Sequence, residues 1–96
     1  MRLSLIQKDV LYYLYCFEQQ KNSEHLAGMA LLNTINEARK LTVADRNFRV
    51  SCHTLNLNGL IEKHRGAQLK LFWSLTEHGK EIAQQIYAAR HEVRVD

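Results

Sequence analysis

One pair of residues in this 96-residue chain, Cys52 and His53, could be considered as a catalytic nucleophile and its base. Adjacent residues of a helix point about 100° apart, so this thiol and imidazole would not face each other. Zinc chemistry would call for Cys-x-x-Cys or His-x3–5-His spacing, and neither occurs in the sequence. The sequence therefore predicts that the protein is not an enzyme and has no metal site and no cofactor.

Basic side chains are concentrated in one segment. The formal net charge is +3, yet residues 1–45 sum to zero and residues 71–96 sum to −1. Between Arg46 and Lys70 there are five basic groups and one acid, Glu62, so this segment carries +4. A local positive excess is typical of a surface that binds a polyanion such as a nucleic acid. A solvated basic face without a partner is the alternative interpretation.

The composition favours one small globular domain that spans residues 1–96. Hydrophobic residues make up 46% of the chain and charged residues 24%, and a chain of this length builds a single modest core. No segment approaches the roughly 18 consecutive apolar residues of a membrane helix. The first residues lack the apolar run of a signal peptide. We therefore expect a cytoplasmic protein without a membrane partner.

Two helices are predicted in the first part of the chain. Ser4 and Gln7 form a Ser-x-x-Gln capping box, in which each residue satisfies a free backbone N–H of the other. Apolar residues at helical spacing extend this helix over residues 5–19. Ser23 is the candidate N-cap of a second helix, which we expect to end at about Lys40.

The third and fourth helices are expected to flank a β-hairpin. Thr42, with an acidic residue three positions later, predicts the start of the third helix, and Asn58-Gly59 predicts its end, since glycine is common at left-handed C-terminal positions. Residues 60–75 predict two strands joined by the tight connection Arg-Gly-Ala, with Leu69 on the buried face of the second strand. Thr76 predicts the cap of the last helix.

The predicted third helix has an apolar stripe, and its opposite face carries side chains that can reach phosphates and base edges. The side chains of that opposite face are Arg46, Asn47, Arg49, Val50, His53 and Thr54. Arg49 can pair with a guanine edge, neutralise a phosphate or remain in solvent. His53 can contact a base or phosphate, or can simply be exposed.

Two motifs give the chain a family resemblance. Leu55 begins the pattern Leu-x-x-x-Gly-Leu-Ile, and residues 71–81 (LFWSLTEHGKE) run from a strand into Leu-Thr-x-x-Gly. With three preceding helices, the chain resembles winged-helix transcriptional regulators of the PadR and MarR type over nearly its whole length. The resemblance implies a mainly α winged helix-turn-helix fold, with three helices, a small β-hairpin and a fourth helix.

The same resemblance implies a DNA-binding surface. In such folds the third helix enters the major groove, and the hairpin, or wing, lies along the flanking backbone or minor groove. The residues 46–54 named above would then read DNA, and the expected wing has about three residues at its tip. The wing residues would be His64, Arg65, Gln68 and Lys70. The implied function is sequence-specific binding of double-stranded DNA by a dimeric transcriptional repressor. The alternative is an architectural, replication or partition module of a plasmid or phage.

The first and fourth helices are expected to form a homodimer. Each helix has more apolar surface than one core-facing stripe requires, and such a surplus in a short chain usually contacts a second subunit. The surplus residues are Leu11, Tyr12, Tyr15 and Cys16 in the first helix and Ala83, Tyr87 and Ala88 in the fourth.

Overall fold

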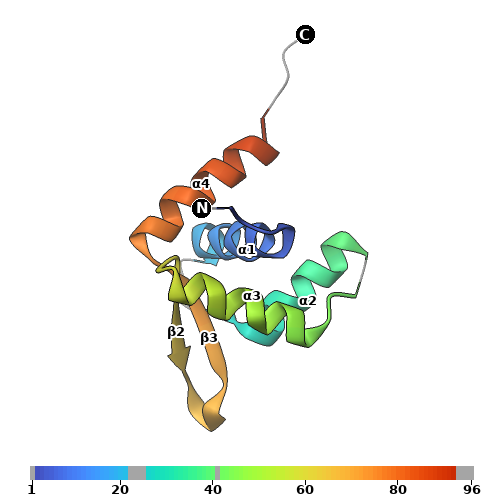
Figure 1. Cartoon of the computed structure of the whole chain (residues 1–96), viewed down its shortest axis with the longest axis vertical. Helices are drawn as coiled ribbons and strands as arrows, with labels where there is room; N and C mark the ends of the chain where they lie inside the picture. Colours follow the sequence, from blue (N-terminus) through green and yellow to red (C-terminus); the bar gives the residue numbers. More distant parts are fainter. Residues whose placement is uncertain (1, 22–25, 41, 93–96) are drawn as a thin grey trace.

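The computed structural model of the chain describes residues 2–21, 26–40 and 42–92. The helices pack into one body, and a β-hairpin protrudes beyond α3 at the end opposite to α4 (Figure 1). The elements in chain order are α1 (Leu5–Lys21), β1 (Leu26–Ala27), α2 (Gly28–Arg39), α3 (Asp45–Leu57), β2 (Ile61–Arg65), the 3-10 turn η1 (Ala67–Leu69), β3 (Leu71–Leu75) and α4 (Glu77–Arg90). No helix within these ranges combines the length and hydropathy of a membrane span.

The predicted capping box at the start of α1 is confirmed. The backbone N–H of Ser4 donates to Gln7 Oε1 over 2.8 Å, and the N–H of Gln7 donates to Ser4 Oγ over 3.1 Å. This exchange satisfies donors that the first turn of a helix otherwise leaves unpaired. The helix continues two residues beyond the predicted end, to Lys21.

A short strand precedes α2, where a continuous helix was expected. Leu26 and Ala27 pair antiparallel with Trp73 and Phe72 of β3, so the helix begins only at Gly28. A Cβ atom at Gly28 would lie 3.3 Å from Trp73 Nε1, which shows how closely the chain passes β3 here. The predicted cap, Ser23, lies outside the described residues. Ala27 occupies the N-cap position and makes no side-chain cap.

The start of α3 also differs from the expected one. The helix begins at Asp45 after Ala44, without a side-chain cap, so Thr42 is not its N-cap. The preceding loop is instead tied to α2, because the N–H of Val43 donates to Asn36 Oδ1 over 2.7 Å. The predicted end is confirmed: Asn58 is the C-cap, and the next residue is a glycine with a φ of +76°.

The three strands form one antiparallel sheet in the order β1-β3-β2. The hairpin connection is longer than predicted, since β3 begins at Leu71 and η1 occupies most of the turn. Gln68 and Leu69 have φ values of +59° and +61°, so they do not extend the strand, and Leu69 is exposed. The tip therefore has the five residues from Gly66 to Lys70 in place of three.

The core lies between the helices and one face of the sheet. Its fully or nearly fully buried apolar side chains are Val10, Leu11, Leu14, Leu31, Leu32, Ile35, Phe48, Cys52, Leu55, Leu60, Ile61, Trp73, Leu75 and Ala83. The apolar stripe predicted for α3 is thus confirmed. Leu11 and Ala83 contribute to the core of a single chain, so the interpretation of these two as surplus surface is wrong.

Two polar contacts join α4 to other parts of the molecule. The predicted cap of α4 is confirmed, as Thr76 Oγ1 accepts the N–H of Gly79 over 3.0 Å. Thr76 Oγ1 also donates to the carbonyl of Gly59 over 2.6 Å, which joins the start of α4 to the end of α3. At the other end of α4, Arg90 donates to the buried carboxylate of Asp9 over 2.9 Å.

Candidate nucleic-acid interface

The packing of α3 leaves one continuous face of that helix in solvent. Phe48, Cys52 and Leu55 are buried at helical spacing, and this fixes the opposite face outward. Of the six residues proposed on the opposite face, five are exposed and Thr54 is half-buried. The exposed five are Arg46, Asn47, Arg49, Val50 and His53. This face therefore offers guanidinium, amide, imidazole and apolar groups together.

Among the residues that the structure describes, Arg49 forms an ion pair with an exposed neighbour. Its Nη2 lies 3.1 Å from Asp45 Oδ2 one turn earlier, and both side chains are more than half exposed. An exposed pair at this helical spacing contributes only about 0.3–0.5 kcal/mol to stability. The guanidinium of Arg49 can therefore exchange Asp45 for another anion at little cost.

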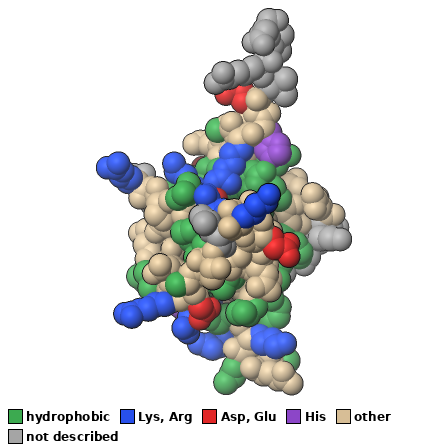
Figure 2. Space-filling model, turned by 90° about the vertical axis from the view of Figure 1, so that its right-hand side faces the viewer, with side chains coloured by type: hydrophobic (Ala, Val, Ile, Leu, Met, Phe, Trp, Pro, Cys, Tyr) green, Lys and Arg blue, Asp and Glu red, His purple; other side chains and the backbone are tan. Residues whose placement is uncertain are grey.

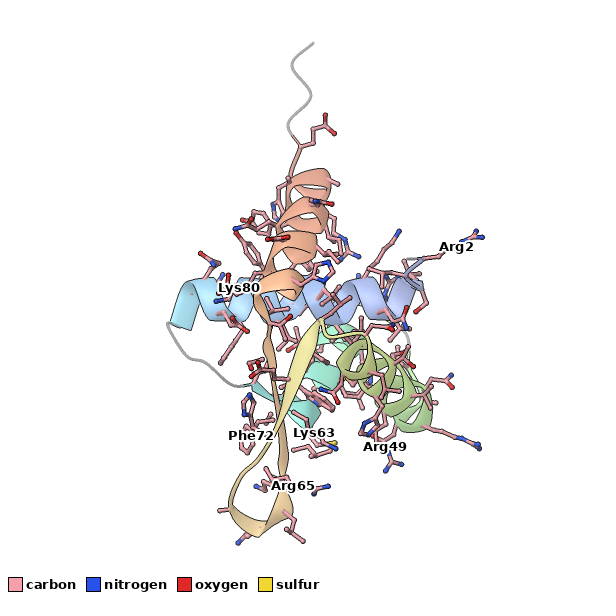
Figure 3. The ribbon with its side chains drawn as sticks, turned by 60° about the vertical axis from the view of Figure 1, so that its left-hand side comes forward. Arg2, Arg49, Lys63, Arg65, Phe72 and Lys80 are labelled. Atoms are coloured by element: carbon pink, nitrogen blue, oxygen red, sulfur yellow. The ribbon has the colours of Figure 1, made fainter. Side chains whose placement is uncertain are left out.

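The hairpin register places its basic residues on one face. In the antiparallel pairing, Lys63 lies opposite Trp73 and Arg65 lies opposite Leu71, and directly paired residues share a face. His53 on α3 packs its ring edgewise against Trp73, with 5.6 Å between ring centroids. Lys63 and Arg65 thus lie on the side of the hairpin that adjoins α3, and Figure 3 shows them with Arg49 at the same end of the molecule.

Lys63 was missed among the site residues predicted from sequence. It is exposed, and its position two residues before Arg65 places it on the same face of β2. The signal that could have found it is the two-residue period of a strand, once Arg65 was taken as a wing residue.

His64 is the predicted residue that the structure places apart from the others. It pairs with Phe72 on the opposite face of the hairpin, where its Nε2 lies 2.9 Å from Ser74 Oγ and 3.7 Å from Glu62 Oε2. The imidazole ring of His64 thus contacts side chains of the same hairpin. The structure therefore does not bring His64 together with the exposed face of α3.

The residues of the hairpin tip are all exposed. Gln68 belongs to η1, and Lys70 lies between η1 and the first residue of β3. Lys70 and Arg49 line the same cavity of about 310 Å³, between α3, the start of α2 and β3, with Phe48, Cys52 and Trp73 also in its lining. Figure 2 shows Lys and Arg side chains at the hairpin end of this face. Cations from α3 and from the wing therefore border one surface.

The Cys52–His53 pair is not arranged as a nucleophile and its base. Cys52 is buried, and burial raises the pKa of its thiol to about 12. The thiol therefore stays protonated near neutral pH, while His53 lies on the exposed side of α3. Within the described ranges, no group of three or more His, Cys, Asp and Glu side chains could hold a metal ion.

The element order, the three-stranded sheet and the exposed third helix beside a hairpin define a winged helix-turn-helix fold. RosR of H. salinarum has the same fold with a TM-score of 0.76 and 20% sequence identity, over 98% of this chain and 82% of RosR. F-93 of SSV1 has a TM-score of 0.69 and 23% identity, over 94% of this chain and 90% of F-93.

A third similar structure belongs to a longer protein. The adhesin competence repressor AdcR of Streptococcus pyogenes has a TM-score of 0.74 and 18% identity, over 95% of this chain and 60% of AdcR. No protein-family model and no curated protein matches the sequence. At these identities the likeness to the solved structures is one of fold.

Proposed function

We propose that the protein binds double-stranded DNA in a sequence-specific manner and regulates transcription as a repressor. The observation that carries this proposal is the common surface bordered by the exposed face of α3 and the basic face of the hairpin. The major groove of B-DNA, about 12 Å wide, admits an α-helix. A hairpin beside that helix then runs along the flanking backbone, where Lys and Arg side chains neutralise phosphates.

The two elements are given different tasks in this proposal. Arg49, near the middle of the exposed face, pairs with a guanine edge, and Val50 beside it contacts a thymine methyl group. Lys63, Arg65 and Lys70 contact phosphates from the hairpin, because their flexible, exposed side chains follow the backbone of the duplex. Specificity therefore comes from α3, and much of the affinity comes from the wing.

The regulatory role rests on fold similarity. AdcR is by its name a repressor, and the chain shares its fold over nearly its whole length. The Leu-x-x-x-Gly-Leu-Ile and Leu-Thr-x-x-Gly motifs support a closer likeness to regulators of the PadR and MarR type. Both observations favour a regulator over an architectural DNA-binding module.

We further propose a homodimer through α1 and α4. Tyr12 and Tyr15 of α1 gather with Tyr87 and His91 at the surface between these helices. The Tyr12 and Tyr87 rings stack with centroids 5.9 Å apart, and Tyr87 remains 37% exposed. An aromatic cluster left partly open in this way fits an interface between two copies related by a twofold axis.

Selection of bound sites from random duplex DNA tests the function. A palindromic consensus, with half-sites about one helical turn apart, would support a dimeric regulator. The Arg49→Ala variant is the matched control, since it removes the proposed base contact and leaves the wing intact. Recovery of bound DNA without any consensus would contradict sequence-specific regulation and favour the architectural role.

A further inference from the structure

The tip of the hairpin exposes a leucine to which the proposed function assigns no role. Leu69 is 76% exposed and lies in η1, at the protruding end of the hairpin (Figure 1). Its φ is +61°, and that of Gln68 before it is +59°. Residues other than glycine, asparagine and aspartate seldom adopt this left-handed backbone conformation. Residues that do adopt it concentrate at functional sites. The turn thus accepts an unfavourable backbone conformation while it projects an apolar side chain outward.

Contacts within the hairpin hold this turn in place. The N–H of Gly66 donates to the carbonyl of Lys70 over 2.9 Å, and the N–H of Lys70 donates to the carbonyl of Ala67 over 3.3 Å. The ring of Phe72 covers Gly66 so closely that a Cβ atom there would lie 2.5 Å from ring Cε1. Leu69 is therefore presented at a defined position.

The charges around Leu69 indicate which partner could bury it. Arg65 and Lys70 flank the turn and are exposed, as is Lys63 farther along β2. An apolar protein surface that covered Leu69 would also have to desolvate these cations, which is unfavourable without matching anions. Duplex DNA supplies both components, since its phosphates neutralise the cations and its bases offer apolar surface inside a groove about 6 Å wide.

We propose that Leu69 enters the minor groove as an apolar wedge and partly unstacks one base step. This inference rests on the proposed binding of duplex DNA and adds to it a distortion of that DNA. Apolar side chains inserted in this way kink a duplex by about 20–90° toward the major groove. Pyrimidine–purine steps such as TA and CA resist unstacking least. The site would therefore prefer such a step at a fixed distance from the bases that α3 contacts.

The experiment uses the full chain and a short duplex of the selected consensus, or of alternating TA steps if selection yields none. The fluorescent base 2-aminopurine replaces one adenine at a time, because its emission rises when it is unstacked. We expect the wild-type protein to raise the emission at one flanking step per half-site. Leu69→Ala should abolish this rise and weaken binding about tenfold, which corresponds to about 1.4 kcal/mol. Leu69→Phe should keep the rise, because a bulky apolar side chain remains.

A matched control separates the wedge from a general loss of apolar surface. Leu57 at the end of α3 is 86% exposed and lies outside the hairpin. Leu57→Ala therefore removes a similar side chain without changing the hairpin tip, and we expect the emission at the flanking step to be unchanged. An unchanged emission in Leu69→Ala would overturn the inference while the proposed function stands. A changed sedimentation coefficient in Leu69→Ala would identify the tip as a subunit contact and also overturn it. If the wild-type protein binds no duplex, the proposed function itself fails.

Discussion

Arg39 and Arg90 differ from Arg49 in how far their acidic partner is exposed to solvent. Arg39 of α2 and Arg90 of α4 both donate to the carboxylate of Asp9 on α1, which is only 1% exposed. Arg49 of α3 pairs with Asp45, and both of those side chains are mostly exposed. Removing one partner of a buried ion pair leaves an uncompensated charge, whereas an exposed pair contributes little and exchanges partners readily.

This difference separates structural cations from cations that are available to a ligand. The two ion pairs at Asp9 join α1, α2 and α4, and Arg90 Cζ also lies 4.6 Å from the centroid of the Tyr12 ring. Within the described ranges, the basic side chains of residues 46–70 form no ion pair with a buried carboxylate. Their ion pairs are the exposed contact of Arg49 with Asp45 and the contact of His64 with Glu62 in the hairpin. Position relative to the core therefore decides which arginines remain available to a ligand.

The largest expected effect is the loss of the buried carboxylate. Asp9→Asn should lower the free energy of unfolding by about 3 kcal/mol, the lower end of the range for breaking a buried pair, because Arg39 and Arg90 can partly reach water. Urea denaturation followed by the fluorescence of Trp73 measures this loss. Asp45→Asn is the control, and we expect it to change stability by less than about 0.5 kcal/mol.

The same carboxylate makes this stability pH-dependent. Burial alone would raise the pKa of Asp9, but hydrogen bonds from Arg39 and Arg90 and their charges outweigh it and lower the pKa below the ordinary value of 3.8. The carboxylate therefore stabilises the fold fully above that value, and its contribution is lost as pH falls through the lower folded pKa. The difference between the wild-type protein and Asp9→Asn should be constant near neutrality and shrink in acid. A difference that does not change with pH would contradict the assignment.

Much of this arrangement could be predicted where the signal is local. The capping box at Ser4, the end of α3 at Asn58-Gly59 and the cap at Thr76 each depend on residues close in sequence, and all three are confirmed. The buried stripe of α3 followed from helical spacing alone. The exposure of its opposite face is a consequence of that stripe.

The features that could not be predicted depend on contacts between distant segments. The strand β1 has two residues, too few for a periodic pattern, and it forms only because β3 lies beside it. The positive φ values at Gln68 and Leu69 have no marker in these residue types. The hairpin register places Lys63 on the same face as Arg65, so Lys63 belongs to the candidate site. Leu11 packs into the core and therefore does not belong to the predicted dimer surface.

A smaller effect is expected from the loss of Arg49, the proposed reader of bases. Arg49→Ala should weaken binding to the selected site by about 1–3 kcal/mol and blur the preference at one position per half-site. The fold should be unaffected, since the side chain is 62% exposed. Binding titrations against the consensus and single-base variants measure both effects. A loss that is equal for all sequences would mean that α3 is not the reader.

The wing should respond to substitution differently from α3. Arg65 lies at the end of β2 beside the tip, so Arg65→Ala should weaken binding to every sequence nearly equally. It should also lower the slope of log affinity against log salt by about one per subunit, since one phosphate contact is lost. Titrations over a series of salt concentrations measure the slope. A changed base preference would instead assign Arg65 to base recognition and remove the distinction between helix and wing.

The smallest effect is expected at Asp45, and it has the opposite sign. Arg49 must leave the Asp45 carboxylate to contact DNA, so Asp45→Asn should strengthen binding about twofold, the equivalent of a helical ion pair worth about 0.3–0.5 kcal/mol. Loss of a negative charge near the phosphates acts in the same direction for all sequences. A double-mutant cycle separates the two causes, because the release of Arg49 contributes only when Arg49 is present. If Asp45→Asn strengthens binding as much in the Arg49→Ala background as in the wild type, the ion pair does not restrain Arg49, and general repulsion explains the gain.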